Sequence, residues 1–441
     1  MRRLFGTDGI RGVAGQEPLD ARTVFAFGRA LGEWACRHPE RRVLIGRDTR
    51  ASGPELAALV AAGVQESGAE PHFAGVVTTP AVAYLTRTGP FSAGVMISAS
   101  HNPWRDNGLK VIAHDGYKLP DSEELELEKR ILEIRDLIRE NPGGISLKED
   151  DSLAARYEQF LAGCGAELAD LPVVLDCAHG AAYRLGPELF RALGARVTEL
   201  ACSPDGRNIN DGCGALHVEA LRQRVLSEGA AFGAAFDGDA DRCILVSASG
   251  RILDGDHILL IGAKAIRPRA VVATVMSNLG LERALAMHGI GLLRTAVGDR
   301  YVLEEMLRQD LPLGGEQSGH VIFRQYATTG DGLLTALRAA AIAREAGASF
   351  DELTREFTVY PQRLVNVRFR EKKPLDQLAS VQCEIRETEQ EFGPAGRVLV
   401  RFSGTEPLAR VMVEGPDAAR VEFRARRIAA AIEAELGSAA G

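Results

Sequence analysis

The feature that most constrains the fold is an acidic triplet that directly follows a short apolar run. Residues 230–236 (AAFGAAF) are apolar, and residues 237–242 (DGDADR) then place Asp237, Asp239 and Asp241 on alternate positions. On a helix, side chains two residues apart point in different directions, so these three could not meet. On a loop that leaves a strand they can surround one ion, and carboxylate oxygens are ligands of hard cations. The pattern therefore predicts a metal-binding loop at the end of a strand.

Other interpretations of the triplet fit the neighbouring residues less well. An EF-hand calcium loop needs glycine at its sixth position and glutamate at its twelfth, where this chain has Arg242 and Ala248. A haloacid-dehalogenase-type phosphatase would use Asp237 as nucleophile and Asp239 as acid, and it favours Thr or Val where Asp241 stands. A solvated acidic turn is the structural alternative. The preceding apolar run favours a metal site over that turn.

A second string, residues 98–103 (SASHNP), also follows an apolar run, residues 91–97. It places the hydroxyl of Ser100 on a turn of small residues that ends in a proline. Serine and asparagine in such a turn often only bond to nearby backbone, which is the plainer interpretation. His101 is adjacent, but a nucleophile and its base usually meet in space rather than in sequence. Phosphoryl transfer needs positioning and neutralisation of charge, so we expect the two strings to act together.

The chain alternates short apolar runs with segments of helical periodicity. The expected strands are residues 42–45, 91–97, 172–176, 270–275 and 397–402, and the expected helices are residues 54–67, 121–140 and 418–436. Strands separated by helices predict an α/β protein with parallel, doubly wound sheets. In such sheets ligands bind at the carboxyl ends of the strands. The strings at Ser100 and Asp237 occupy that place, and the string at Arg401 begins near the end of a strand.

Size and composition limit the class of protein. The 441 residues suggest roughly two to four domains, and the net charge of -8 argues against nucleic acid or an anionic membrane as the main partner. No apolar run approaches the ~20 residues of a membrane span, and the first residues contain no apolar core of a signal peptide. The seven cysteines lack a Cys-x-x-Cys pair, which fits reduced thiols better than a disulfide framework. We therefore expect a cytoplasmic protein.

Two further strings contain groups that suit an anionic, hydroxyl-rich ligand. Residues 401–407 (RFSGTEP), with Arg410 close behind, combine exposed backbone amides, hydroxyls and arginines, which is a composition that holds phosphate. Residues 314–320 (GGEQSGH) form a glycine-rich segment in which Glu316 and Ser318 could hold sugar hydroxyls. For each string an ordinary turn is the alternative, and His320 could equally be a packed histidine.

Taken together, the strings resemble one family. Residues 7–12 (TDGIRG), 98–103, 237–242, 315–320 and 401–407 follow the order of the motifs of the α-D-phosphohexomutases, and they span nearly the whole chain. The resemblance implies an α/β fold of four domains around a central cleft, the first three with doubly wound mixed or parallel sheets and the fourth a smaller α+β domain. The implied domains are residues 1–152 for the phosphoserine, 153–253 for the metal, 254–367 for the sugar and 368–441 for the phosphate.

The resemblance also implies an activity. Gln317 is typical of the branch that acts on aminosugars, where related branches often have methionine. The expected reaction interconverts glucosamine 6-phosphate and glucosamine 1-phosphate through a phosphoserine and a bisphosphorylated sugar, a step towards UDP-N-acetylglucosamine and the cell wall. A phosphomannomutase/phosphoglucomutase and a magnesium-dependent sugar phosphatase are the alternatives. The implied partners are the phosphosugars and, as a homodimer, a second copy of the chain, with no nucleic acid and no membrane.

The resemblance assigns a role to each candidate residue. Ser100 would carry the phosphoryl group and must be phosphorylated for activity. One magnesium ion per subunit would be bound by Ser100, Asp237, Asp239 and Asp241. The acid–base or charge-stabilising groups would be Arg11, Lys110 and His320. Sugar hydroxyls would be held by Glu316 and Ser318, and the phosphate that is not being transferred by Arg401, Ser403, Gly404, Thr405 and Arg410.

Overall fold

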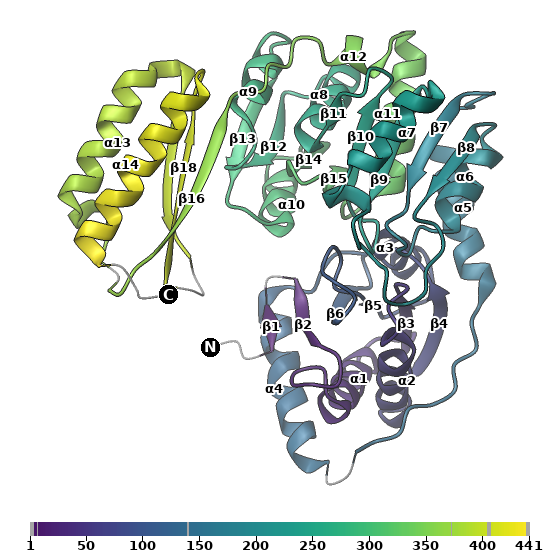
Figure 1. Cartoon of the computed structure of the whole chain (residues 1–441). Helices are drawn as coiled ribbons and strands as arrows, with labels where there is room; N and C mark the ends of the chain where they lie inside the picture. The colour runs from purple at the N-terminus through teal and green to yellow at the C-terminus, as the bar shows by residue number, and fades with distance from the viewer. Residues whose placement is uncertain (1–3, 7, 139–140, 372, 404–406, 438–441) are drawn as a thin grey trace. The chain divides into compact units, whose positions relative to one another are not determined.

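The computed structural model describes residues 4–6, 8–138, 141–371, 373–403 and 407–437. The chain divides into two compact units: residues 1–276 with 292–354, and residues 277–291 with 355–441 (Figure 1). Three sheets are built mainly from the first unit, and the second unit contains a smaller three-stranded sheet. The expected α/β class, with three mixed sheets and a smaller last domain, is confirmed.

The first sheet has the strand order β1-β2-β6-β5-β3-β4. Only the pairs β5–β3 and β3–β4 are parallel, and the other three pairs are antiparallel. Its strands are β1 (Phe5–Gly6), β2 (Gly9–Val13), β3 (Arg42–Arg47), β4 (Glu70–Val76), β5 (Ala93–Ile97) and β6 (Asp106–Ala113), and its helices are α1 (Ala21–Ala35), α2 (Gly53–Glu66), α3 (Thr79–Thr88) and α4 (Asp121–Leu137).

Different helices cover the two faces of this sheet. Helices α1, α2 and α4 cover one face, where Leu109 and Val111 of β6 join the hydrophobic core (Figure 1). Side chains alternate along a strand, so Lys110, between these two, points to the opposite face. Helix α3 packs on that face, because a Cβ on Gly94 would lie 2.3 Å from the side chain of Thr86. The alternation therefore places one buried lysine on the α3 side of the sheet.

The second sheet has the order β11-β10-β9-β7-β8, with parallel pairs β9–β7 and β7–β8 and antiparallel pairs elsewhere. Leu221 and Val225 of α7 pack on Val174 and Ala235 of its central strands. The elements are α5 (Asp151–Cys164), β7 (Pro172–Asp176), α6 (Leu185–Ala192), β8 (Arg196–Leu200), the 3₁₀ turn η1 (Gly214–Leu216), α7 (Glu219–Glu228), β9 (Phe232–Phe236), β10 (Cys243–Ser247) and β11 (Ile252–Leu253).

The third sheet has the order β13-β12-β14-β15, in which β12–β14 is parallel and β14–β15 antiparallel. Val302 and Met306 of α10 pack on Val272. The elements are α8 (Gly255–Ile266), β12 (Ala270–Thr274), β13 (Gly291–Thr295), α10 (Asp299–Arg308), β14 (Leu313–Gly315), β15 (Val321–Phe323), α11 (Gly332–Ala346) and α12 (Phe350–Leu353).

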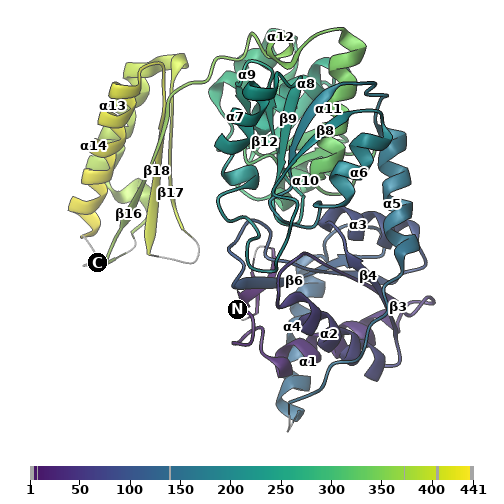
Figure 2. The same cartoon turned by 45° about the vertical axis from the view of Figure 1, so that its right-hand side comes forward.

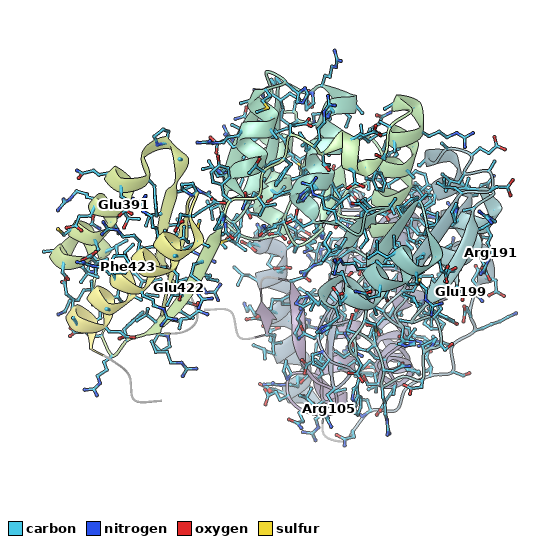
Figure 3. The ribbon with its side chains drawn as sticks, turned by 45° about the horizontal axis from the view of Figure 1, so that its top comes forward. Arg105, Arg191, Glu199, Glu391, Glu422 and Phe423 are labelled. Atoms are coloured by element: carbon cyan, nitrogen blue, oxygen red, sulfur yellow. The ribbon has the colours of Figure 1, made fainter. Side chains whose placement is uncertain are left out.

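The second unit is an antiparallel sheet in the order β16-β18-β17, with α13 and α14 on one face (Figure 2). Glu391, which is labelled in Figure 3, lies on α13. It accepts hydrogen bonds from Arg420 and Arg424 of α14, which joins the two helices. The elements are α9 (Leu279–Ala286), β16 (Gln362–Arg368), η2 (Leu375–Gln377), α13 (Ala379–Phe392), η3 (Gly393–Ala395), β17 (Arg397–Phe402), β18 (Leu408–Glu414) and α14 (Ala418–Leu436).

The structure confirms most of the expected elements and corrects two expectations. The strands at 172–176 and 397–402 and the helix at 418–436 have the expected bounds, but the helix that begins at Asp121 ends at Leu137, before residue 140. The alternation of strands and helices alone predicted parallel sheets, whereas each sheet of the first unit is mixed and contains an antiparallel hairpin, β5–β6, β9–β10 or β14–β15. Among the described helices, none combines the length and the apolar content that crossing a bilayer requires.

Candidate active site

The sequence strings of the first unit occupy equivalent places in its three sheets. Each forms the connection between two adjacent antiparallel strands: β5 to β6 at Ser100, β9 to β10 at Asp237, and β14 to β15 at Glu316. In each case the first strand also pairs with a parallel neighbour. These loops therefore leave the carboxyl end of a strand, as the sequence predicted, but they are hairpin connections rather than strand-to-helix turns.

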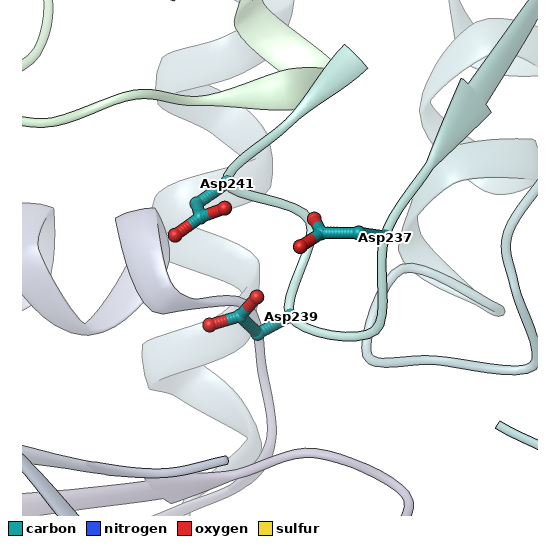
Figure 4. Close-up of side chains that lie close together, drawn as sticks. All are labelled: Asp237, Asp239 and Asp241. Carbon is teal, nitrogen blue, oxygen red and sulfur yellow. The ribbon is translucent and has the colours of Figure 1, made fainter. Parts of the chain in front are cut away.

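The acidic triplet forms a compact group of ligands. One oxygen from each of Asp237, Asp239 and Asp241 can be chosen so that all three lie within 4.8 Å of one another, and all three residues are buried (Figure 4). Alanine at position 240 has a φ of +56°, so the loop turns sharply between the second and third carboxylate. The loop geometry thus does what a helix could not do, and it turns alternate side chains towards one space.

Hydrogen bonds fix one oxygen of Asp239, whereas a second oxygen of Asp239 and one of Asp241 accept none from the described residues. Asp239 Oδ2 accepts hydrogen bonds from Thr79 Oγ1 at 2.5 Å and from Lys110 Nζ at 2.8 Å. Among the described residues, Asp239 Oδ1 and Asp241 Oδ1 accept no hydrogen bond although both are buried. A buried carboxylate oxygen without a donor is costly, and a bound cation removes that cost. The donor set, which is entirely carboxylate, fits a hard divalent cation.

Ser100 lies directly against this loop. It is 2% exposed, and its Oγ donates to Asp237 Oδ2 at 2.5 Å. His101 Nδ1 lies 3.3 Å from the same Oγ, so this adjacent pair is in contact, contrary to the expectation that sequence neighbours would not meet. Burial, followed by the charges of Arg242 and Arg11, lowers the pKa of His101 to about 4. A neutral imidazole therefore faces the serine hydroxyl at neutral pH.

One buried lysine lies close to three carboxylates of this site. Lys110 is 3% exposed, and its Nζ lies 2.8 Å from Asp239, 3.0 Å from Asp8 and 3.6 Å from Asp241. Burial opposes its charge, but these three carboxylates hold its pKa well above the usual value. Arg11 pairs with the same Asp8 at 2.5 Å. Both sequence-predicted cations are therefore linked to the metal loop, Arg11 through Asp8 and Lys110 directly.

Burial and neighbouring charges shift the pKa values of Asp237 and Asp241 in opposite directions. Burial, then Asp241 and Asp239, raises the pKa of Asp237 to about 8. Burial would also raise the pKa of Asp241, but Lys110, His320 and Arg242 hold it well below its usual range. The loop therefore contains one carboxyl that holds a proton at neutral pH in the metal-free protein, and a second that stays ionised.

A further set of charges links this centre to the third sheet. Lys118 donates to Asp8 Oδ1 at 2.5 Å and to Asp299 Oδ2 at 2.6 Å. His320 is 4% exposed, and its Nδ1 lies 3.7 Å from Asp241. Its Nε2 accepts the Gly330 N–H at 2.9 Å, which leaves the ring proton on Nδ1. A cavity of about 570 Å³ borders Lys110, Lys118 and His320. Clustered perturbed groups beside a cavity mark a functional site.

The loop between β14 and β15 presents the two residues expected to hold sugar hydroxyls. Glu316 is half-buried, and its Oε1 accepts the Gly298 N–H at 3.1 Å, whereas Ser318 is exposed. Gly319 has a φ of +94°, and a Cβ there would lie 2.4 Å from the Cys243 carbonyl oxygen of the metal-loop hairpin. This glycine therefore allows the two hairpin loops to pack closely.

The expected phosphate cradle lies in the second unit. Arg401 of β17 is paired in register with Arg410 of β18, so the two guanidinium groups come from directly opposed positions. Burial and then the charge of Arg410 lower the pKa of Arg401. The Ser403 N–H donates to the Leu408 carbonyl at 2.7 Å. Gly404 and Thr405, which the sequence analysis also assigned to this site, lie outside the described residues.

Sequence reasoning missed several partners in the centre. Asp8 was noticed only as part of a string, although it accepts both Lys110 and Lys118. Thr79 and Asp299 carried no sequence signal, because they lie 160 and 181 positions from their partners Asp239 and Lys118. The one indirect signal is their position: Thr79 begins α3 shortly after strand β4 ends, and Asp299 begins α10 shortly after strand β13 ends.

Comparison with known proteins identifies the family. Four family models match in order: Phosphoglucomutase/phosphomannomutase, alpha/beta/alpha domain I at residues 2–137, domain II at 156–250, domain III at 254–360, and the C-terminal domain at 364–431. The chain belongs to the phosphoglucomutase/phosphomannomutase family. The resemblance inferred from the five strings is thereby confirmed.

Individual members of the family resemble the chain over its whole length. A phosphoglucosamine mutase of Solibacter usitatus is 58% identical over 442 residues, covering 98% of this chain and 99% of the relative. The crystal structure of a phosphoglucomutase/phosphomannomutase family protein from Burkholderia thailandensis superimposes with a TM-score of 0.81 at 26% identity, covering 99% of this chain and 98% of that one. An Aspergillus fumigatus N-acetylphosphoglucosamine mutase, solved with GlcNAc-6P and magnesium, shares the fold with a TM-score of 0.66 at 18% identity, covering 98% and 96%.

Proposed function

We propose that the chain is a phosphoglucosamine mutase, an isomerase that interconverts glucosamine 6-phosphate and glucosamine 1-phosphate. The observation that carries the proposal is the contact of Ser100 Oγ with Asp237 on the acidic loop, at 2.5 Å. It occurs in a chain that is 58% identical, end to end, to a relative named for that activity. A hydroxyl beside a cation site is the arrangement that a phosphoryl carrier needs.

Ser100 carries the phosphoryl group between two positions of the sugar. In the first half-reaction the free sugar hydroxyl attacks the phosphorus on Ser100, the new sugar O–P bond forms, and the bond to Oγ breaks. The attacking hydroxyl gives up its proton, the leaving Ser100 Oγ takes one up, and the product is a sugar bisphosphate. After the bisphosphate reorients, Ser100 Oγ loses that proton as it attacks the other phosphorus, and the sugar oxygen at that position gains a proton. The serine is phosphorylated again, and no water is consumed.

The metal belongs at the acidic triplet. Asp237, Asp239 and Asp241 would hold it together with an oxygen of phosphorylated Ser100. Magnesium is our choice because the donor set is all oxygen and because phosphate oxygens complete the magnesium sites of many phosphoryl-transfer enzymes. When bound, magnesium supplies neutralisation of the charge on the transferring phosphoryl group. The carboxyl of Asp237, whose pKa is raised to about 8, releases its proton when the metal binds.

The cations around the triplet stabilise charge. Lys110 stays an ammonium at neutral pH because three carboxylates raise its pKa, so it acts as a hydrogen-bond and charge donor towards the transferring group. Arg11, which pairs with the same oxygen of Asp8 as Lys110, has the same role. His320, whose Nδ1 lies 3.7 Å from Asp241, orients that carboxylate.

Two other sites hold the substrate. Glu316 and Ser318 accept and donate hydrogen bonds to sugar hydroxyls from the loop between β14 and β15. In the second unit Arg401 and Arg410, with Ser403, Gly404 and Thr405, hold the phosphate that is not being transferred, because two opposed guanidinium groups favour an anion between them. We keep the domain boundaries at 152/153, 253/254 and 367/368, a homodimer and a cytoplasmic location as parts of this proposal.

The test is a coupled assay that compares glucosamine, glucose and mannose 6-phosphates at equal enzyme concentration. Glucosamine 6-phosphate should have the highest kcat/KM, by about tenfold or more, because one or two hydrogen bonds to the C2 substituent distinguish the three sugars. Gln317 to Met is the matched variant, since it should narrow the preference without abolishing turnover. Equal or better efficiency with a neutral hexose phosphate would assign the chain to a sister activity with the same carrier.

A further inference from the structure

Ser100 has a backbone conformation that an L-residue rarely adopts. Its φ is +52°, in the left-handed region where a side chain is strained. Such residues persist only where the surrounding structure determines their conformation, and they concentrate at functional sites. The conformation must therefore be held by contacts to the two peptide groups that flank Ser100.

Arg50 makes one of these contacts and two more to the same loop. Its guanidinium donates to the carbonyl oxygens of Ser100 at 2.8 Å, of Asn102 at 2.9 Å and of Pro103 at 3.0 Å. The side chain is fully buried, in the turn between β3 and α2. A planar fork with several donors can hold three carbonyls of one loop at once, whereas a lysine ammonium on its flexible stem cannot match that geometry.

A chain of contacts through Asp48 closes a ring around the backbone of Ser100. The Arg50 Nε lies 2.9 Å from Asp48 Oδ2, and that oxygen accepts the Ser98 hydroxyl at 2.6 Å. Ser98 Oγ in turn accepts the Ser100 N–H at 2.9 Å. Both polar backbone groups of Ser100, its N–H and its carbonyl, are thus held by one buried Arg–Asp pair.

A second side chain reaches the same carbonyls from another part of the chain. Asn210 Nδ2 donates to the Ser100 carbonyl at 3.0 Å and to the Asn102 carbonyl at 3.1 Å. Asn210 lies between β8 and α7, in the sequence region of the second sheet, and its own N–H donates to the Ala178 carbonyl. The carrier loop is therefore clamped between the first and the second sheet.

We propose that Arg50 and Asn210 are positioning residues for the phosphoryl carrier, which hold Ser100 in its left-handed conformation so that Oγ points at the acidic loop. The inference rests on the proposed function of Ser100. Both side chains donate to backbone carbonyls of the carrier loop, so their loss should slow transfer to and from Ser100 while sugar phosphate binding is kept. Small errors in the alignment of reacting groups have large effects on rate.

The test uses two variants and one control. Arg50→Lys keeps the positive charge beside Asp48 but loses the fork. Asn210→Gly removes the amide together with its methylene, and glycine tolerates the φ of +59° at that position. Arg338→Lys is the control, because Arg338 also donates to a backbone carbonyl, that of Cys164 at 2.9 Å, far from the carrier loop in sequence. Folded fraction is measured by circular dichroism and phosphorylation of Ser100 by intact mass.

The expected result is a split between kcat and KM. Arg50→Lys should lower kcat by about 10- to 100-fold and Asn210→Gly by roughly tenfold, with KM within about threefold of wild type. In rapid-quench experiments, phosphorylation of Ser100 by glucose 1,6-bisphosphate should slow by the same factors, whereas Arg338→Lys should match wild type.

Two results would overturn the inference. One is a kcat within twofold of wild type for both variants when they are folded and phosphorylated; if Arg50→Lys does not fold, Asn210→Gly alone decides. The other is a loss of kcat that only follows the folded fraction, since that is what a purely structural role predicts. Failure of wild-type Ser100 to accept a phosphoryl group would instead contradict the proposed function itself.

Discussion

The site around Ser100 in the first unit and the pair Arg401 and Arg410 in the second unit have opposite balances of charge. Around Ser100 the cation Lys110 is surrounded by three carboxylates. In the second unit, Arg401 and Arg410 occupy paired positions on the adjacent strands β17 and β18. No ion pair joins either of them to a described carboxylate. The first arrangement has acidic oxygens left over for a cation, and the second has guanidinium groups left over for an anion.

This difference in charge indicates a separate role for each site. Surplus carboxylate oxygens, such as Oδ1 of Asp239 and of Asp241, suit a metal that neutralises a group in transfer. Two like charges at directly opposed positions of a sheet destabilise it. A bound phosphate would relieve that repulsion, so the second unit is suited to holding a phosphate without reacting with it. Variants in each site should therefore have different kinetic signatures.

The largest effect should come from removing the carrier in the first site. Ser100→Ala should lower turnover by at least about 10³-fold, since no other group can accept the phosphoryl group. The fold should persist, and the variant should gain no phosphoryl mass from a sugar bisphosphate. Ser227→Ala, which removes an exposed hydroxyl on α7, is the control and should match wild type. Retention of more than a few per cent of activity would contradict the role of Ser100.

Removing a surplus carboxylate should have the next largest effect. Asp239→Asn should weaken magnesium binding by about 10- to 100-fold or more and should lower turnover by orders of magnitude, because a charged ligand becomes neutral. Calorimetry measures the binding, and EDTA should silence the wild type until magnesium is returned. Asp150→Asn is a matched control, since Asp150 is an exposed N-cap and asparagine caps equally well. Activity indifferent to EDTA would refute a metal at the triplet.

In the second unit, Arg410→Ala should affect both binding and rate. A lost charge-assisted hydrogen bond is worth roughly 1.5–3 kcal/mol, which is about 10- to 100-fold in kcat/KM. KM should rise and kcat should fall, because the phosphate must be held in both half-reactions, whereas magnesium affinity should not change. Arg363→Ala is the control: Arg363 lies in β16 of the same sheet and pairs with Glu422. Unchanged kinetic constants for Arg410→Ala would contradict a phosphate site at this arginine pair.

A last effect, a pH dependence of magnesium affinity, should appear only at the first site. In the metal-free protein the pKa of Asp237 is raised to about 8, so the carboxyl is protonated below that pH and must lose its proton to bind a cation. Magnesium affinity should therefore rise with pH by up to about tenfold per unit below 8, and it should level off above 8. Asp237→Asn should bind more weakly, with a flatter profile. A wild-type affinity independent of pH between 6 and 8 would contradict this account.

The same shift has a consequence for stability. An unfolded aspartate has a pKa of about 3.9, so between that value and about 8 the folded metal-free protein binds one more proton at Asp237 than the unfolded chain. Stability of the metal-free protein should consequently fall as the pH rises through this window. Thermal unfolding in EDTA measures it, and excess magnesium should remove the decline. A melting temperature that rises across the window in EDTA would show that other groups dominate.

Sequence predicted the parts of the site that lie in contiguous strings after apolar runs. The triplet could be placed on a loop because its alternate spacing rules out a helix, and Ser100 because its string also leaves a strand. The contact between the two strings depends on how the first two sheets pack, which no local pattern records. For the same reason Thr79, Asp299 and Asn210 could not be found, since each acts on a residue more than a hundred positions away.

The fold was predictable to a similar depth. Apolar runs located the strands. The antiparallel direction of β6 and β10 depends on short hairpin connections, and the residues of these connections also form the site. The burial of Lys110 could be explained only afterwards, because alternation gives two faces and the sequence does not say which face α3 covers. A charged residue between Leu109 and Val111 was the one available signal.

The central claim is that the phosphoryl group passes through Ser100 to the sugar, and one measurement tests it most directly. Protein carrying labelled phosphate on Ser100 is mixed with unlabelled glucosamine 6-phosphate and magnesium, and the products are quenched within one turnover. Our account predicts that the label leaves Ser100 at the rate of turnover and appears in the sugar phosphates. Label released as inorganic phosphate, or label that stays on the protein while the sugar turns over, would contradict it.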